Sequence, residues 1–383
     1  MTRDPVRLVI VMDHPAQQFT RGLQLLSDDP SVDVRVYYWS VAKRFHDQGF
    51  GREISWDVDL LAGYRSSKPP WPASVLARLL WLVRQLRAAR PDVVVCYGWA
   101  SWIARASLVY CMLSRTRLLM YGDSTWQHSS RGKGRLPRSV AMRLVMRACS
   151  GAIETGTFNR EFYIQHGLDP SRIWPGVCPA DTEAFGRARR QDRGATSAAE
   201  SPLRIGFAGK LIPRKGADVL LRALALLPDM PAWSASVVGD GPLRSDLQEL
   251  ARDLGVADRV TFHGFANTSE LPKLLSEFDI MVVPSRMDMR VLVTIEAMAA
   301  GAATVVSDAT AVWGPGDLIQ EGVTGLVHAS DDPGDLARQL SRLLGNRELL
   351  TALRRNGTER VADFGPEAFA RTMASAAHGR RSA

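Results

Sequence analysis

Three cations stand close together in a glycine-flanked segment in the second half of the chain. The segment runs from Gly209 to Gly216 and supplies Lys210, Arg214 and Lys215. Glycine lets the backbone approach a ligand closely, and lysine and arginine side chains bind phosphate oxygens. This chemistry suits a diphosphate. The segment is not a Walker loop, because the glycine spacing and the terminal Ser or Thr of that motif are absent.

Two carboxylates follow an apolar strand predicted at residues 280–283. Asp288 lies in the loop after that strand, and Glu296 lies inside a helix predicted over about 291–300, with seven residues between the two. A helix N-terminus presents free N–H groups and favours a phosphate. Carboxylates cannot bind a phosphate, but they accept hydrogen bonds from hydroxyl groups on either side of one. The pattern therefore predicts a diphosphate with a sugar on one side and a ribose on the other.

The elements that position these residues form a second α/β series. Two further turns, Gly239 with its neighbours and His263 with Gly264, also follow predicted strands. Each turn is a weak signal by itself, but in a parallel sheet the carboxyl ends of the strands share one edge, where ligands bind. The predicted strands are 203–208, 234–238, 259–262, 280–283 and 304–306, and the helices fall near 216–227, 242–254, 269–277 and 292–300.

The first half shows the same alternation of strands and helices. Strands are predicted at 7–12, 34–39, 92–97, 118–121 and 152–154, with helices between most of them, which indicates a doubly wound sheet. His14 follows the first strand, so it either contacts substrate or caps and packs locally. Residues 43–73 hold many aromatics and prolines without a steady period. They are predicted to be a long irregular loop, which either contributes to an acceptor pocket or folds on its own side chains.

The polar run 187–202 is the best linker candidate. It separates a predicted domain at 1–186 from one at 203–365, and two such domains are expected to face one another across a cleft. Residues 1–190 contain 27 Lys and Arg against 16 Asp and Glu, whereas residues 191–383 contain 21 against 24. The basic first half favours either an anionic partner, such as a phosphorylated acceptor or an acidic membrane surface, or a merely solvated arginine-rich surface.

Helix 74–90 carries leucines on one side and arginines elsewhere, so it either packs on a sheet, as is more usual, or lies on a membrane surface. Nucleic acid is not favoured, because the basic residues are scattered without interleaved aromatics. No signal peptide or membrane-spanning run is visible. We therefore expect a cytoplasmic protein, with membrane association left open. The four cysteines are expected to be buried thiols: Cys96, Cys111, Cys149 and Cys178.

The residues of the second half resemble the nucleotide-binding domain of retaining GT-B glycosyltransferases, specifically glycosyltransferase family 4 (glycosyl transferases group 1). The resemblance covers roughly 203–345, and the first half resembles the family more faintly. It rests on these segments: 209–216, 238–242, His263-Gly264, Pro284-Ser285, the Asp288 and Glu296 pair, 317–327, His14-Pro15, Gln17-Gln18 and 159–163. The resemblance implies two Rossmann-like domains (GT-B) and a C-terminal helix, 366–383, that returns to the first domain.

The resemblance also implies roles for individual residues. Lys210 and Lys215 would bind the donor diphosphate, with Gly209, Arg214, Gly239 and His263 in the same donor site. Asp288 would hold hydroxyls of the donor sugar, and Glu296 the ribose. The backbone of Met289, Arg290, Val291 and Leu292 would cradle phosphate. Asp123, Ser124 and His14 would form the acceptor-facing wall.

The chain departs from the family pattern at several positions. Asp288 stands where the family has glutamate, Lys210 where it usually has arginine, and Met289-Arg290-Val291 where it has Gly-Phe-Gly. The lost glycines restrict the backbone beside the phosphate, and Arg290 adds a charge there. These changes leave the donor sugar open and leave room for an inactive relative.

The predicted activity is transfer of a sugar, with retention, from a nucleotide-diphosphate donor, with UDP favoured, to a small-molecule or lipid-linked acceptor hydroxyl. Such enzymes serve polysaccharide, glycolipid and natural-product pathways. No cofactor is expected, since the nucleotide-sugar is a substrate, and no metal, since no ligand cluster or Asp-x-Asp appears. Two alternatives remain: a nucleotide-sugar 2-epimerase of the same architecture, and a binding module that has lost turnover.

Overall fold

The computed structural model divides into two compact units. The first unit comprises Met1–Ala42, Asp59–Pro179 and Gly365–Ala383, and the second comprises Lys43–Val58 and Ala180–Phe364. The structure describes residues 4–41, 44–47, 49–55, 58–70, 73–125, 135–192, 202–230, 232–289 and 291–380. Each unit is built around its own parallel sheet.

The sheet of the first unit has the strand order β5-β2-β1-β6-β7-β8-β9, and all its pairs are parallel. Apolar, β-branched runs form its central strands, as expected for a sheet buried on both faces. The strands are β1 (Val6–Met12), β2 (Val32–Tyr38), β5 (Ser66–Ser67), β6 (Val93–Tyr97), β7 (Arg117–Tyr121), β8 (Gly151–Ile153) and β9 (Ile173–Trp174).

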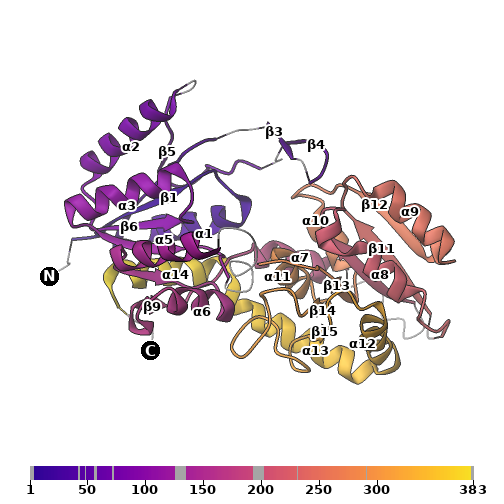
Figure 1. Cartoon of the computed structure of the whole chain (residues 1–383). Helices are drawn as coiled ribbons and strands as arrows, with labels where there is room; N and C mark the ends of the chain where they lie inside the picture. The colour runs from indigo at the N-terminus through magenta and orange to yellow at the C-terminus, as the bar shows by residue number, and fades with distance from the viewer. Residues whose placement is uncertain are drawn as a thin grey trace. The chain divides into compact units, whose positions relative to one another are not determined.

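Alternate residues of these strands enter two separate apolar clusters, one on each face. On one face, Phe19 and Leu23 of α1 (Gln17–Asp28) pack with Phe369 and Met373 of α14 (Pro366–His378) (Figure 1). The other face is covered by α2 (Val75–Ala89), α3 (Trp102–Ser114), α5 (Arg135–Ala148) and α6 (Thr157–Gln165). The C-terminal helix α14 therefore belongs to the first unit.

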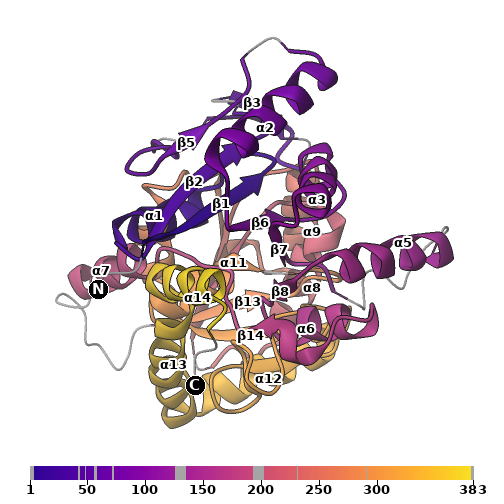
Figure 2. The same cartoon turned by 90° about the vertical axis from the view of Figure 1, so that its left-hand side faces the viewer.

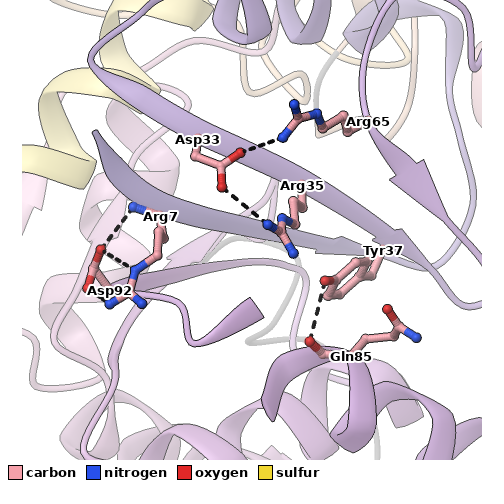
Figure 3. A network of polar contacts seen from close by, with 7 residues as sticks. All are labelled: Arg7, Asp33, Arg35, Tyr37, Arg65, Gln85 and Asp92. Atoms are coloured by element: carbon pink, nitrogen blue, oxygen red, sulfur yellow. Dashed lines mark hydrogen bonds and ion pairs between the residues drawn. The ribbon is translucent and has the colours of Figure 1, made fainter. Parts of the chain in front are cut away.

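Polar contacts join neighbouring strands of this sheet to one another and to one helix (Figure 3). The guanidinium of Arg7 in β1 donates to both carboxylate oxygens of Asp92, at 2.6 and 3.1 Å, just before β6 begins. The Tyr37 hydroxyl donates to the backbone carbonyl of Gln85 in α2 at 3.5 Å. These contacts join β1 to β6 and β2 to α2, which orders the surface built on α2.

The sheet of the second unit has the order β12-β11-β10-β13-β14-β15, and its pairs are also parallel. Its strands are β10 (Leu203–Ala208), β11 (Trp233–Val238), β12 (Val260–Gly264), β13 (Ile280–Val283), β14 (Ala303–Ser307) and β15 (Leu326–His328). The chain places β11 and β12 on one side of β10, and β13 to β15 on the other. The order therefore reverses between β10 and β13.

Helices cover both faces of this second sheet as well. The main apolar cluster takes side chains from α8 (Ala217–Leu224), α9 (Arg244–Asp253), α12 (Pro333–Gly345) and α13 (Arg347–Arg360). Three further helices pack against one another, namely α7 (Thr182–Asp192), α10 (Leu271–Ser276) and α11 (Leu292–Ala299). The predicted α/β class and Rossmann-like sheets are confirmed in both units.

The structure corrects the prediction for residues 43–73. Within that range lie an antiparallel hairpin, β3 (Arg44–Asp47) with β4 (Arg52–Ser55), and the edge strand β5. The hairpin belongs to the second unit, although its sequence lies inside the first half. The residues are thus neither uniformly irregular nor part of one domain.

The predicted linker and domain boundaries also differ from the structure. Helix α7 continues through Asp192, so the first part of the predicted linker at 187–202 is helical, and residues 193–201 lie outside the described residues. The main segment of the second unit begins at Ala180, before the predicted boundary at residue 186, whereas the return to the first unit at Gly365 lies one residue from the predicted 366. In the described parts of the chain, no helix combines the length and the apolar character needed to cross a membrane.

Candidate active site

The candidate site of the second unit lies where its strand order reverses. The loops after β10 and β13 meet there, at the carboxyl ends of neighbouring parallel strands, which is where open α/β sheets bind ligands. Gly216 has a φ of 70°, and a Cβ atom at this position would lie 2.0 Å from the carbonyl oxygen of Pro284. A side chain at residue 216 would therefore push the two loops apart.

A second close approach brings the turn after β11 to the same place. Gly239 has a φ of 134°, and a Cβ there would lie 1.9 Å from the carbonyl oxygen of Gly209. The N–H of Gly209 donates to the carbonyl of Val238 at 2.9 Å. The predicted donor-site glycines Gly209 and Gly239 thus lie side by side, and the absence of a side chain at Gly239 lets the loops pack.

Asp288 is the centre of the polar contacts between the first two loops. Its side chain is 8% exposed and forms ion pairs with the Lys215 ammonium and the Arg214 guanidinium, the latter at 3.3 Å. The backbone N–H of Met289 donates to Asp288 Oδ1 at 3.1 Å, and the Ser285 hydroxyl donates to Oδ2 at 3.4 Å. The structure therefore brings together four predicted site residues, Arg214, Lys215, Asp288 and Met289.

Arg286, which the sequence prediction missed, ties these loops together. Its guanidinium donates to both carboxylate oxygens of Asp218, at 2.8 and 2.6 Å, and to the carbonyl of Pro213 at 2.7 Å. It also donates to Asp331 at 2.8 Å. The hydrogen bonds with Asp218 raise the pKa of Arg286. Burial opposes ionisation of Asp218, but the bonds from Arg286 outweigh it and lower the pKa of that carboxyl.

Lys210 pairs with a different carboxylate, that of Asp47 in the hairpin. Its ammonium donates to both carboxylate oxygens of Asp47, at 2.9 and 2.7 Å, and lies 5.0 Å from the centre of the Phe50 ring. Burial opposes ionisation of Asp47, but the hydrogen bonds from Lys210 and from the Phe50 and Gly49 N–H groups lower its pKa. The hairpin loop therefore contributes a carboxylate to the predicted phosphate-binding segment.

Glu296 lies in α11, buried and close to a second carboxylate. Burial raises its pKa to about 7, and the negative charge of Asp181 adds to that shift. Asp181, which precedes α7, was not predicted as part of the site. The electrostatic effect of Asp181 on Glu296 follows from the packing of α7 against α11, for which the local sequence offers no signal.

The N-terminus of α11 has no side-chain cap. Val291 is the N-cap residue, and no side chain caps the helix. Leu292 begins the helix, as predicted, while Arg290 lies outside the described residues. A helix start without a side-chain cap leaves N–H groups for an anion.

His263 is placed differently from the prediction. It lies inside β12 and not after it, and its Nε2 is 3.1 Å from the Ser236 hydroxyl of β11. No contact with the predicted lysines is recorded for it in the described part of the unit. The strand extends to Gly264, which explains why a residue expected in the turn pairs across the sheet instead.

The predicted acceptor residues lie in the first unit. His14 is exposed just after β1, and Asp123 and Ser124 follow β7, so all three stand at the carboxyl edge of the first sheet. Asn159 fixes the second of these loops, because its side-chain amide donates to the Ser124 carbonyl at 2.7 Å. The Thr155 hydroxyl donates to the Gly122 carbonyl at 3.1 Å.

The described residues contain no cluster of three or more His, Cys, Asp or Glu side chains that could hold a metal ion. The candidate site of the second unit contains three positively charged side chains. Lys210, Arg214 and Lys215 lie at one sheet edge, against the carboxylates of Asp47 and Asp288. Such a set can bind a polyanion that displaces or bridges the carboxylates.

The fold is that of GT-B glycosyltransferases, two Rossmann-like α/β units. Residues 188–360 match the family model described as glycosyl transferases group 1, which spans just under half of the chain. The cation-bearing loops, Asp288 and Glu296 all fall within the matched segment.

Particular relatives agree with this class. The chain is 34% identical over 209 residues to a D-inositol 3-phosphate glycosyltransferase of Mycobacterium sp. (strain KMS), a match that covers 52% of this chain and 45% of the relative. The chain thus spans less than half the length of that curated relative. Among solved structures, Anabaena Alr3699/HepE in complex with UDP has a TM-score of 0.73 at 16% identity, covering 98% of this chain and 100% of that one. The lipopolysaccharide outer core galactosyltransferase WaaB has a TM-score of 0.70 at 14% identity, covering 98% and 99%.

Proposed function

We propose that the protein is a retaining, metal-independent hexosyltransferase of glycosyltransferase family 4. It moves a sugar from a nucleotide-diphosphate donor, preferably a UDP-sugar, to an acceptor hydroxyl. The observation that carries the proposal is the set of three cations at the point where the second sheet reverses its strand order. That set lies within the segment that matches the glycosyl transferases group 1 model. The solved HepE structure contains UDP, which supports the choice of nucleotide.

The donor would occupy the loops after β10 and β13. Lys210, Arg214 and Lys215 bind the diphosphate, together with the N–H groups at the start of α11 and at Met289. Asp288 accepts hydrogen bonds from hydroxyls of the donor sugar, and Glu296 from those of the ribose. The bound diphosphate takes over Lys215 from Asp288 and Lys210 from Asp47, which frees Asp47 and leaves Asp288 beside Arg214.

The reaction is a displacement at the anomeric carbon. The bond between that carbon and the phosphate oxygen breaks, and a bond to the acceptor oxygen forms on the same face. The acceptor proton passes to a phosphate oxygen of the departing nucleotide. The lysines stabilise the charge that develops on the diphosphate, an electrostatic contribution that often dominates catalysis.

The acceptor would bind on the first unit, at the sheet edge that holds His14, Asp123 and Ser124. We propose a small-molecule or lipid-linked acceptor from polysaccharide, glycolipid or natural-product biosynthesis. The enzyme would work in the cytoplasm, with peripheral contact between its basic first unit and an acidic membrane surface. Water is excluded from the donor when both substrates are bound.

The first experiment is a thermal-shift panel of UDP-, GDP-, dTDP- and ADP-sugars, each with and without EDTA. A ligand that binds only the folded state raises the melting temperature by mass action. We expect a clear rise with the UDP-sugar that EDTA does not change. NMR of the product of that donor then tests retention. No rise with any donor at saturation would contradict the donor site. A rise without turnover would favour a binding module that has lost turnover, and a changed sugar without transfer would favour an epimerase.

A further inference from the structure

The outer surface of the first unit is apolar over three neighbouring helices. Of the fifteen large apolar residues that are exposed in the described parts of the chain, nine lie on α2, α3 and α5. They are Val75, Leu76 and Leu80 on α2, Trp102, Val109, Met112 and Leu113 on α3, and Val140 and Leu144 on α5. Helix α3 packs against both α2 and α5 (Figure 2), and the exposed side of these three helices that carries the nine residues is called here the α2–α3–α5 face.

This exposure remains after the helices have packed on the sheet. Leu82 and Leu86 of α2 are fully buried in the first unit, and Ile103 of α3 is buried with them. The leucines on the outward side are therefore not needed for the core of the unit. Leu80 is 54% exposed and Leu113 is 83% exposed. A group of exposed large apolar side chains on neighbouring helices indicates an interaction site.

The charged residues of the same three helices are all basic. Their sequences contain eight arginines and no aspartate or glutamate. Arg84, Arg87, Arg143 and Arg147 are exposed, and none of these four forms an ion pair with a carboxylate in the described parts of the chain. Their charge is therefore available to an anionic partner, and guanidinium groups bind phosphate in particular.

A cavity of about 540 Å³ opens between α2 and α3. Its apolar lining includes Leu79, Val83 and Leu113, and its polar lining includes Arg87 and Arg105. An apolar groove with guanidinium groups beside it matches a molecule that joins a hydrocarbon chain to a phosphate. Phospholipids have that combination of parts.

We propose that the α2–α3–α5 face binds an anionic phospholipid surface, with its leucines and Trp102 among the upper acyl chains and its arginines at the phosphates. The inference assigns the proposed peripheral contact to a defined surface, and it does not depend on the transfer reaction. A second copy of the chain would bring an equally basic face against this one, and the like charges would repel. Nucleic acid offers no apolar partner for Leu113.

The test is flotation of the full chain with vesicles of phosphatidylcholine alone or mixed with phosphatidylglycerol. One variant, Arg84→Glu with Arg87→Glu, reverses two exposed charges, and a second, Leu80→Ser with Leu113→Ser, removes apolar contact. Matched controls on the second unit are Arg252→Glu with Arg347→Glu, and Leu226→Ser, where Leu226 is 61% exposed. All substituted side chains are at the surface, so the variants are expected to fold.

We expect the protein to float with the anionic vesicles and not with the neutral ones. The charge-reversal variant should weaken the apparent partition coefficient on the order of tenfold or more, because one basic residue contributes about 1 kcal/mol near such a surface. The serine variant should also weaken it, because it removes apolar side chains from the acyl-chain region. The control variants should bind as the parent does. No flotation with anionic vesicles, equal flotation with neutral vesicles, or equal loss in the controls would overturn the proposal.

A site-specific probe adds an independent readout. The four native cysteines are buried, so a single introduced cysteine takes an environment-sensitive dye. The emission of the dye at Leu113→Cys should shift to the blue on anionic vesicles, while that at Leu226→Cys should not. A concentration-dependent dimer that Leu113→Ser dissolves, without any blue shift on vesicles, would instead make the face an interface between copies.

Discussion

Lys215 and Asp288 form the most enclosed ion pair of the candidate site, with side chains 18% and 8% exposed. A diphosphate offers Lys215 more negative charge than one carboxylate does, so ligand binding can exchange partners without leaving a buried charge unpaired. Arg214 stays within reach of Asp288 when Lys215 turns to the ligand. We therefore predict that the pair stabilises these loops and that Lys215 exchanges Asp288 for a diphosphate when the donor binds.

Replacement of this lysine tests the phosphate assignment. We expect Lys215→Ala to lower the transfer rate on the order of 100-fold, since removal of one charge-stabilising group typically has such an effect. Folding should suffer little, because Arg214 remains to pair with Asp288. Steady-state kinetics and a thermal melt measure the two effects, and Lys273→Ala, an exposed lysine of α10, is the control. Full activity of Lys215→Ala would contradict the assignment.

Glu296 predicts a pH dependence of stability. Its folded pKa of about 7 lies above the ordinary value of 4.5, so between these pH values the folded state holds a proton that the unfolded state has lost. The free energy of unfolding should therefore fall as the pH rises through this window, by about 3 kcal/mol from this group. Glu296→Gln should remove that part of the slope, as measured by urea titrations from pH 4.5 to 8. An unchanged slope would show that Glu296 does not titrate in this window.

The β3–β4 hairpin contributes contacts to the candidate donor site that the sequence did not predict. Besides the Asp47 contact with Lys210, its Phe50 ring lies 5.0 Å from that of Phe265, the residue after β12. A Cβ at Gly241 would lie 2.9 Å from the carbonyl of Gly49. The hairpin therefore packs closely against the loops of the second sheet.

The hairpin carboxylate should compete with the donor. We expect Asp47→Asn to strengthen UDP binding several-fold, because a partly exposed ion pair contributes about 0.2–1 kcal/mol and the diphosphate no longer has to break it. Titration calorimetry measures the affinity. The control is Asp229→Asn, which breaks the Asp229–Arg259 ion pair elsewhere in the unit. Weaker UDP binding in Asp47→Asn would mean that Asp47 positions Lys210 for the ligand.

These elements also show what the sequence could and could not predict. Strand β13, the start of α11 and the Asp288 loop follow from local apolar runs and turn residues, so their predictions match the structure closely. The Asp47–Lys210 pair joins residues 163 positions apart, and no local pattern reveals such a partner. The polar sequence of residues 187–192 led to their prediction as linker, although they form the last part of α7. Its Glu183–Arg187 pair, four residues apart, was the available helical signal.

Across the whole molecule, the chain returns to its first unit at the end. Helix α14 packs on α1 so closely that a Cβ at Gly22 would lie 2.5 Å from the Phe369 ring. Arg117 of β7 donates to the carbonyls of Ala377 and Ala376, at 2.8 and 3.1 Å. The first unit is thus completed by residues that follow the entire second unit in sequence, and its stability depends on both ends of the chain.

Phe369→Ala tests whether the two units unfold independently. The ring is 2% exposed and packs against Phe19 and Tyr121, so its loss should destabilise the first unit by about 3–5 kcal/mol. Differential scanning calorimetry should show one transition shifted down, while the transition that UDP raises keeps its position. Leu226→Ala, at an exposed site, should change neither. If Phe369→Ala lowered both transitions equally, the two units would unfold as one cooperative body, and the donor site would depend on α14 for its stability.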